Sequence, residues 1–162
     1  MANSVKDPIL VSIIGGSGYT GAELIRLVSK HPYFQLNQVV ANRNADKKIQ
    51  DIFPHLRHLN LPDFISFDQM DFDNVDLIFC ALPHATSQEI IVKIPEGKKI
   101  IDLSADFRLE SIEEYERWYG TKHIANSLQK KAVYGLTEIY KEKIKKGSLI
   151  ACTGCNSAAT LY

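Results

Sequence analysis

The 162-residue sequence has no excess of either charge, because 19 lysine and arginine residues balance 19 aspartate and glutamate residues. A protein that binds nucleic acid or an anionic membrane through its overall field needs a basic surplus, so neither partner is favoured. No apolar run approaches the length of a membrane-spanning helix. The polar residues 1–8 also lack the apolar core of a signal peptide. These absences predict a protein with no membrane or nucleic-acid partner.

Cysteine is scarce, and its odd count of 3 does not make a disulfide framework. We therefore expect the cytoplasm or another reducing compartment. His55 and His58 have no cysteine or carboxylate at matching spacing, so they are interpreted as loop residues and no metal site is predicted. The length, with 45% hydrophobic and 23% charged residues, is typical of one globular domain.

Glycine is concentrated near the amino end, in the sequence GGSGYTG at residues 15–21. Gly16, Gly18 and Gly21 fit the GxGxxG pattern, between an apolar strand-like run at 9–14 and a helix-like segment at 22–30. In such turns the first glycine permits a tight turn, the second lets a pyrophosphate approach, and the third allows close helix–strand packing. The helix N-terminus then offers N–H groups to the phosphates. The alternative is a glycine-rich turn without a ligand.

The second predicted strand, residues 34–41, is followed by Asn42 and Arg43 instead of an acidic residue. An acidic side chain at this point usually binds the ribose hydroxyls of NAD, whereas an arginine can pair with the 2′-phosphate of NADP. The sequence therefore favours NADP over NAD. A solvated basic loop is the alternative.

Later strands are predicted at 75–81, 99–103, 132–134 and 149–151. His84 falls where the first of these meets a helix, at the sheet edge that binds ligands in open α/β folds. Asp106 and Arg108 follow the next strand, either as a surface ion pair or with Asp106 orienting Arg108 toward an anionic substrate group. The sequence from Ser111 to Glu114 fits a capping box, which predicts a helix over 112–119.

The last strand leads to Cys152 and Cys155, and the small residues after Cys155 predict a helix that begins there. A helix N-terminus favours the thiolate, which is the nucleophilic form of cysteine, and the Asn156 N–H could face an oxyanion. Three alternatives compete: an inert buried thiol, a Cys152–Cys155 redox pair, and a zinc site, for which a second CxxC is missing.

These motifs together resemble the amino-terminal half of the N-acetyl-gamma-glutamyl-phosphate reductase family, within the semialdehyde dehydrogenase superfamily. The matching stretches, in family order, are GSGYTGAEL at 16–24, FPHL at 53–56, ALPH at 81–84, IDLSADFR at 101–108, YGL at 134–136 with Glu138, and GC at 154–155.

The resemblance implies an α/β, Rossmann-type domain over residues 1–162, with a doubly wound, mostly parallel sheet and helices on both faces. It implies NADPH-dependent reduction of N-acetyl-gamma-glutamyl phosphate to the semialdehyde in arginine biosynthesis. Cys155 is then the nucleophile that accepts the acyl group, and Arg108 is the candidate for binding the substrate anion. The implied cofactor contacts are Gly16, Ser17, Gly18, Tyr19, Thr20, Gly21, Asn42, Arg43, Leu82, Pro83, His84 and Ser104.

The resemblance also implies a general acid/base histidine beyond Tyr162, in a second domain that carries substrate contacts and the interface of a homo-oligomer. We therefore expect residues 1–162 alone to bind NADP weakly and to turn over little. The sequence departs from the family pattern at Ala85, a common glycine position, at Thr137, a usual proline position, and around the nucleophile. There Cys152, Thr153 and Asn156 replace the asparagine, proline and tyrosine of Asn-Pro-Gly-Cys-Tyr. Two alternatives follow: a reductase of N-acetyl-aminoadipyl phosphate in lysine biosynthesis, or a non-catalytic dinucleotide-binding module.

Overall fold

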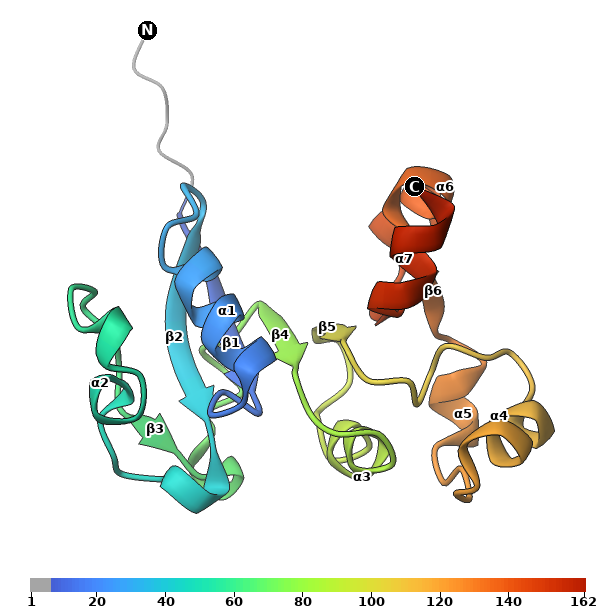
Figure 1. Ribbon diagram of the computed structural model, residues 1–162, viewed down its shortest axis with the longest axis horizontal. Coiled ribbons are helices and arrows are strands. Elements are labelled where there is room, and N and C mark those ends of the chain that lie inside the picture. The colour runs from blue at the N-terminus through green and yellow to red at the C-terminus, as the bar shows by residue number, and fades with distance from the viewer. Residues whose placement is uncertain (1–6) are drawn as a thin grey trace, which may run out of the picture. The chain divides into compact units, whose positions relative to one another are not determined.

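A computed structural model describes residues 7–162, so most of the polar segment at 1–8 lies outside the described residues. The chain forms two compact units, Met1–Leu77 and Ile78–Tyr162, and Figure 1 gives the positions of their helices and strands along the chain. Among residues 7–162, no helix has the length and apolar character needed to cross a bilayer.

The first unit is built on parallel strands in the order β3-β2-β1. The apolar run of β1 is buried along most of its length, as in parallel strands covered on both faces, and Val11 and Ile13 are 0% exposed. Helix α1 follows β1 after the glycine turn. The elements of this unit are β1 (Ile9–Ile14), α1 (Tyr19–Val28), β2 (Phe34–Val40), η1 (Asn42–Asn44), α2 (Ile49–Ile52), η2 (Pro54–Leu56), β3 (Phe64–Ile65) and η3 (Phe67–Gln69).

The second unit has the strand order β4-β5-β7-β6, and β7 pairs in parallel with both β5 and β6. The carboxyl end of β7 therefore lies between the ends of two neighbouring strands. The elements are β4 (Leu77–Cys80), α3 (Thr86–Ile91), β5 (Lys99–Asp102), α4 (Ile112–Tyr119), α5 (Asn126–Gln129), β6 (Val133–Gly135), α6 (Thr137–Lys146), β7 (Leu149–Cys152) and α7 (Cys155–Leu161).

The predicted α/β class is confirmed by the alternation of helices with parallel strands. Helix α4 has the predicted bounds, because Ser111 accepts a hydrogen bond from the Glu114 N–H at 3.2 Å and Gly120 ends the helix in the left-handed conformation. Helix α1 begins at Tyr19, whereas the apolar spacing predicted a start at residue 22. The turn after β1 is therefore shorter than predicted. The short elements between residues 49 and 69 were not predicted, since their apolar residues have no regular period.

Ala85 precedes helix α3 with φ 67° and ψ −27°, a conformation that favours glycine. We expect Ala85→Gly to raise the free energy of unfolding by about 1 kcal/mol, because it removes the contact of Cβ with the backbone in the left-handed region. Urea unfolding measures the change. The control Ala159→Gly, within helix α7, should instead lower stability by about 0.5–1 kcal/mol. Equal losses in both variants would contradict a strained Ala85.

Candidate functional site

The glycine turn after β1 is fastened to the end of β2. The N–H groups of Gly15 and Gly16 both donate to the Val40 carbonyl, at 3.0 and 2.9 Å. The left-handed residue of the turn is Gly15, with φ 86°. Gly16, to which the sequence interpretation gave the tight turn, lies in the same turn directly after Gly15.

The three glycines of the fingerprint have different surroundings. A Cβ at Gly16 would lie 2.1 Å from Val39 Cγ1, and one at Gly21 would lie 2.5 Å from the Gly15 carbonyl oxygen. Both positions are therefore required by packing. At Gly18 the nearest atom would be 3.8 Å away, and this residue is exposed. Gly18 is thus the position where a ligand can approach the backbone closely.

The amino end of helix α1 lacks a cap. Gly18 supplies no side-chain hydrogen bond, and the first turn contains no acidic residue. Ser17 is half-buried, whereas Tyr19, which is 96% exposed, and Thr20 lie at the surface. The first N–H groups of a helix have no acceptor within it, so this end can bind an anion. The open Gly18 backbone and the uncapped helix together fit the pyrophosphate of a dinucleotide.

Asn42 and Arg43 lie just beyond Val40, the residue that anchors the glycine turn, in the short helix η1. The Asn42 side chain accepts a hydrogen bond from the Phe67 N–H at 2.8 Å and so holds the following loop. Arg43 is exposed. A cationic side chain therefore stands at the end of β2, on the same unit as the glycine turn, where a 2′-phosphate could pair with it.

In the second unit, the loop after β4 is fastened to the loop after β5 by the buried carboxylate of Asp106. It accepts hydrogen bonds from the Ala85 N–H at 2.8 Å, the Gln88 N–H at 3.0 Å and the Tyr115 hydroxyl at 2.9 Å. The Tyr115 hydroxyl has a raised pKa, because of its burial and this bond to Asp106. Both interpretations of Asp106 with Arg108, a surface pair and an orienting pair, are wrong, since Asp106 is buried and bonds other groups.

Asp102 makes a second connection between these loops. Its carboxylate accepts hydrogen bonds from the hydroxyls of Ser87 and Ser104, both at 2.6 Å. Burial raises the pKa of Asp102, and the serine hydrogen bonds oppose that rise. Ser104, a predicted cofactor residue, is 1% exposed, and its hydroxyl oxygen also accepts the Asp106 N–H at 3.1 Å. Ser104 therefore shapes the loop.

His84 is exposed at the start of this loop, after the half-buried Leu82 and the exposed Pro83. Its Nδ1 accepts a hydrogen bond from the Ala105 N–H at 2.9 Å. In the neutral ring the proton must then be on Nε2, which makes this nitrogen a hydrogen-bond donor. The ring of Tyr119 lies 5.8 Å away between centroids. The His84 ring is thus oriented by the backbone and has a donor available for a ligand.

Arg108 connects the ends of β5 and β7. Its Nε donates to the Cys152 carbonyl at 2.7 Å, and its Nη2 donates to the Leu103 carbonyl at 2.8 Å. A Cβ at Gly154 would lie 3.2 Å from Nη1. The guanidinium therefore lies against the segment that leads to Cys155. Sequence reasoning missed these contacts, because backbone acceptors leave no residue-type signal.

The three cysteines differ in exposure: Cys155 is exposed, Cys152 is half-buried and Cys80 is buried. Cys155 is the first residue of α7, as predicted. No turn is assigned from 152 to 155, and Gly154 is extended, with φ −67° and ψ 148°. Cys152 and Cys155 are both free thiols in the structure.

Thiol labelling should follow these differences. Burial raises the pKa of Cys152, with Asp102 adding to the rise and Arg108 opposing it, and burial also raises the pKa of Cys80. Because the thiolate is the reactive form, we expect iodoacetamide near pH 8 to modify Cys155 first. Cys152 should follow only as the pH rises, and Cys80 only on unfolding. Peptide mapping after timed quenching measures the order, and faster labelling of Cys152 than of Cys155 would contradict it.

Replacing the Asp106 carboxylate by a neutral amide should lower the stability of the fold. We expect Asp106→Asn to lower the free energy of unfolding by about 1–3 kcal/mol, because an amide replaces one of the oxygens that accept buried donors. The exposed Glu110 gives a matched control, and Glu110→Gln should change stability by less than about 0.5 kcal/mol. Denaturant unfolding measures both variants. An equally small effect at Asp106 would show that its hydrogen bonds contribute nothing net.

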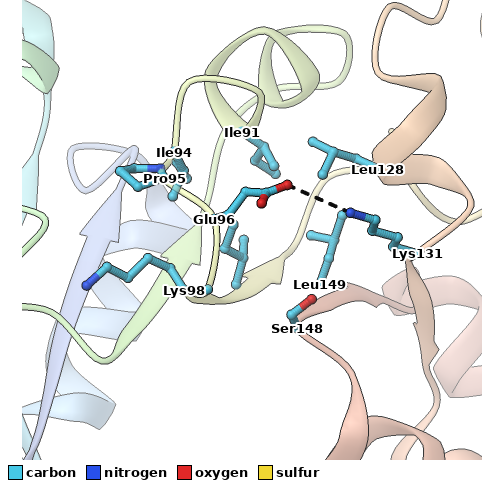
Figure 2. A pocket seen from close by; sticks show the side chains of 11 residues that line it. Ile91, Ile94, Pro95, Glu96, Lys98, Leu128, Lys131, Ser148 and Leu149 are labelled. Atoms are coloured by element: carbon cyan, nitrogen blue, oxygen red, sulfur yellow. Dashed lines mark ion pairs between the residues drawn. The ribbon is translucent and has the colours of Figure 1, made fainter.

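The second unit also contains a cavity of about 210 Å³ between α3, α5 and the starts of β5 and β7. Figure 2 shows an apolar lining that includes Ile91, Leu128 and Leu149, with Glu96 and Lys131 facing each other across it at 3.9 Å. None of the predicted site residues lines this cavity. In the part of the chain that the structure describes, no group of His, Cys, Asp and Glu side chains could hold a metal ion.

The sequence matches a known protein family and is similar to a named relative. Residues 10–147 match the family described as "Semialdehyde dehydrogenase, NAD binding domain". A relative from Rhodobacter capsulatus, named N-acetyl-gamma-glutamyl-phosphate reductase, is 51% identical over 152 residues, which are 94% of this chain and 44% of the relative.

Solved structures support the same fold. An aspartate semialdehyde dehydrogenase II from Vibrio cholerae is 14% identical with a TM-score of 0.67, over 96% of this chain and 44% of that protein. The Candida albicans aspartate semialdehyde dehydrogenase, solved with NADP, is 19% identical with a TM-score of 0.63, over 94% and 44% of the two chains. The Rossmann-type fold is thereby confirmed, and the chain spans less than half the length of these relatives.

Proposed function

Because the chain belongs to the semialdehyde dehydrogenase NAD-binding domain family, we propose that it forms the cofactor-binding and nucleophile-bearing part of an NADPH-dependent acyl-phosphate reductase. Its substrate is N-acetyl-gamma-glutamyl phosphate and its product the semialdehyde, in arginine biosynthesis. The observation that carries this proposal is the exposed Cys155 at the start of α7, beside a strand end fastened by Arg108.

The first chemical step belongs to Cys155. Its thiolate attacks the carbonyl carbon of the acyl phosphate. The bond from that carbon to the phosphate oxygen breaks, phosphate is released, and a thioester on Cys155 remains. The N–H groups at the start of α7, including that of Asn156, have no acceptor inside the helix and can donate to the developing oxyanion. Arg108 lies beside Gly154, where its cationic guanidinium favours an anionic substrate group. Bound NADPH supplies the hydride that reduces the thioester.

Candidate cofactor contacts are proposed for each unit by itself. On the first, the open Gly18 backbone and the uncapped end of α1 support pyrophosphate binding, with Gly16 and Gly21 fixing the turn and Ser17, Tyr19 and Thr20 around it. Arg43, with Asn42 beside it, supports NADP over NAD, and the Candida albicans relative was solved with NADP. On the second, we assign cofactor contacts to Leu82, Pro83 and the Nε2 donor of His84. Ser104 contributes through the loop that it holds.

The chain corresponds to 44% of its Rhodobacter relative. We propose that the general acid/base, the substrate-binding part and the interface of a homo-oligomer belong to the remainder of such a protein. A small-molecule substrate needs no membrane or nucleic-acid partner, and none is proposed. A reducing compartment, the cytoplasm, suits a nucleophile that must remain a free thiol.

The reverse reaction tests this function. The protein that carries this chain should form NADPH from NADP⁺, phosphate and N-acetylglutamate semialdehyde. The homologue for lysine biosynthesis, one methylene longer, should react about 10- to 200-fold less efficiently. The opposite preference would assign the protein to N-acetyl-aminoadipyl phosphate. NADP binding without turnover of either compound would show that the protein is a non-catalytic dinucleotide-binding module.

A further inference from the structure

The position of the Cys155 sulfur depends on a short link. Thr153 and Gly154 alone separate the last residue of β7 from the first residue of α7. Strand β7 is buried and paired on both sides, so the link sets the direction in which α7 leaves the strand. The contacts of Thr153 and Gly154 therefore determine the position of the Cys155 thiol.

The side of the link nearer β5 is held by Arg108. Two carbonyls, those of Leu103 and Cys152, accept its hydrogen bonds, and the guanidinium lies 3.2 Å from the place where a Gly154 Cβ would stand. These contacts fasten the end of β7, but the Arg108 hydrogen bonds stop at the Cys152 carbonyl. They leave the orientation of Thr153 to other groups.

The side nearer β6 supplies that restraint. The hydroxyls of Tyr134 and Thr153 lie 2.7 Å apart, in a hydrogen bond that is partly buried. Strands β6 and β7 approach closely just beside it, since a Cβ at Gly135 would lie 2.9 Å from the Ala151 carbonyl oxygen. The Tyr134 ring is itself supported edge-on by Tyr140 of α6, with 6.2 Å between centroids. The contact with Tyr140 thus restrains the ring that carries the Tyr134 hydroxyl.

Thr153 occupies the position where the resembling family has proline. A proline ring fixes its own φ near −65°, so it restrains the link without any partner. Threonine lacks that ring, but its hydroxyl can be bonded. The hydrogen bond between the Tyr134 and Thr153 hydroxyls therefore supplies by tertiary contact a restraint that proline supplies covalently.

We propose that the Tyr134–Thr153 hydroxyl pair is a positioning device that holds Cys155 in the orientation needed for acyl transfer. The inference rests on the proposed role of Cys155 as the nucleophile. The two hydroxyls bond each other, whereas the Cys155 sulfur contacts the Asn156 side chain. Both residues act through the link, so their removal should affect acyl transfer more than the simple accessibility of the thiol.

The test uses Thr153→Val and Tyr134→Phe, which remove one hydroxyl each, together with the double variant and Thr153→Ser, which keeps the hydroxyl. In the protein that carries this chain, acylation of Cys155 by N-acetyl-gamma-glutamyl phosphate is followed by quenched mass spectrometry. Each single variant should acylate about 3- to 10-fold more slowly, the range expected for one hydrogen bond. The double variant should be no slower than the singles, and Thr153→Ser should match the unchanged protein. Iodoacetamide labelling of Cys155 should change less than twofold.

Amide hydrogen exchange of residues 153–157 supplies a readout that needs no substrate. Exchange should become about 3- to 10-fold faster in Thr153→Val and Tyr134→Phe, and should stay unchanged in Thr153→Ser. Unchanged exchange and acylation in the two hydroxyl-deleting variants would overturn the positioning device. If the unchanged protein that carries this chain is never acylated while its variants show the faster exchange, the proposed function fails and the restraint on the link stands.

Discussion

Cys155→Ser is expected to lower kcat/KM for acyl-phosphate reduction by at least about a thousandfold, because a serine hydroxyl without an activating base is a weak nucleophile. The substitution removes only the sulfur at an exposed position, so the fold should stay intact. Steady-state kinetics give the loss, and a circular dichroism melt verifies the fold. NADP affinity should stay within twofold of that of the unchanged protein.

The matched variant is Cys152→Ser, which removes a thiol three residues earlier in the chain. The thioester mechanism needs one sulfur, so this change should lower kcat/KM by no more than a few fold. A redox pair needs both sulfurs, and equal losses in the two variants would replace the thioester by dithiol chemistry. A Cys155→Ser variant with nearly full activity would show that Cys155 is not the nucleophile.

Arg43→Asp is expected to weaken NADP binding by about 100-fold, since a charge-assisted contact with the 2′-phosphate is replaced by repulsion. NAD has no such phosphate, and a carboxylate at this position can accept hydrogen bonds from its ribose hydroxyls. The NADP-to-NAD preference should therefore reverse. Fluorescence titration with both reduced nucleotides measures the two dissociation constants at one salt concentration.

Lys48→Asp provides the comparison for charge alone. It makes the same change of charge on the same unit, at an exposed residue before α2. Screening at physiological salt limits such distant effects, so NADP affinity should fall less than threefold. Similar losses from both variants would mean that a general basic loop attracts the nucleotide and that Arg43 makes no specific contact.

The predictable parts of this protein are those encoded locally. The glycine pattern with its flanking strand and helix predicted the turn at 15–21, and the capping box from Ser111 to Glu114 predicted helix α4. The start of α7 at Cys155 followed from a run of small residues after a buried strand. In each case the residues that decide the conformation are neighbours in the sequence.

The parts that sequence reasoning missed depend on contacts between distant segments. Asp106 was paired with Arg108 because they are two residues apart, yet its carboxylate bonds Ala85, Gln88 and Tyr115. Arg108 bonds the carbonyl of Cys152, 44 residues away. Backbone N–H and carbonyl groups occur at nearly every position, so no residue type reveals which of them a buried side chain will bind.

The most direct test of the central claim is the mass of the protein that carries this chain after mixing with N-acetyl-gamma-glutamyl phosphate in the absence of nucleotide. We expect one N-acetylglutamyl group per chain, located on Cys155 by peptide mapping, with one phosphate released for each group attached. Hydroxylamine should remove the group, as it does for a thioester. Phosphate release with no protein adduct, or an adduct on Cys152 in place of Cys155, would contradict the account.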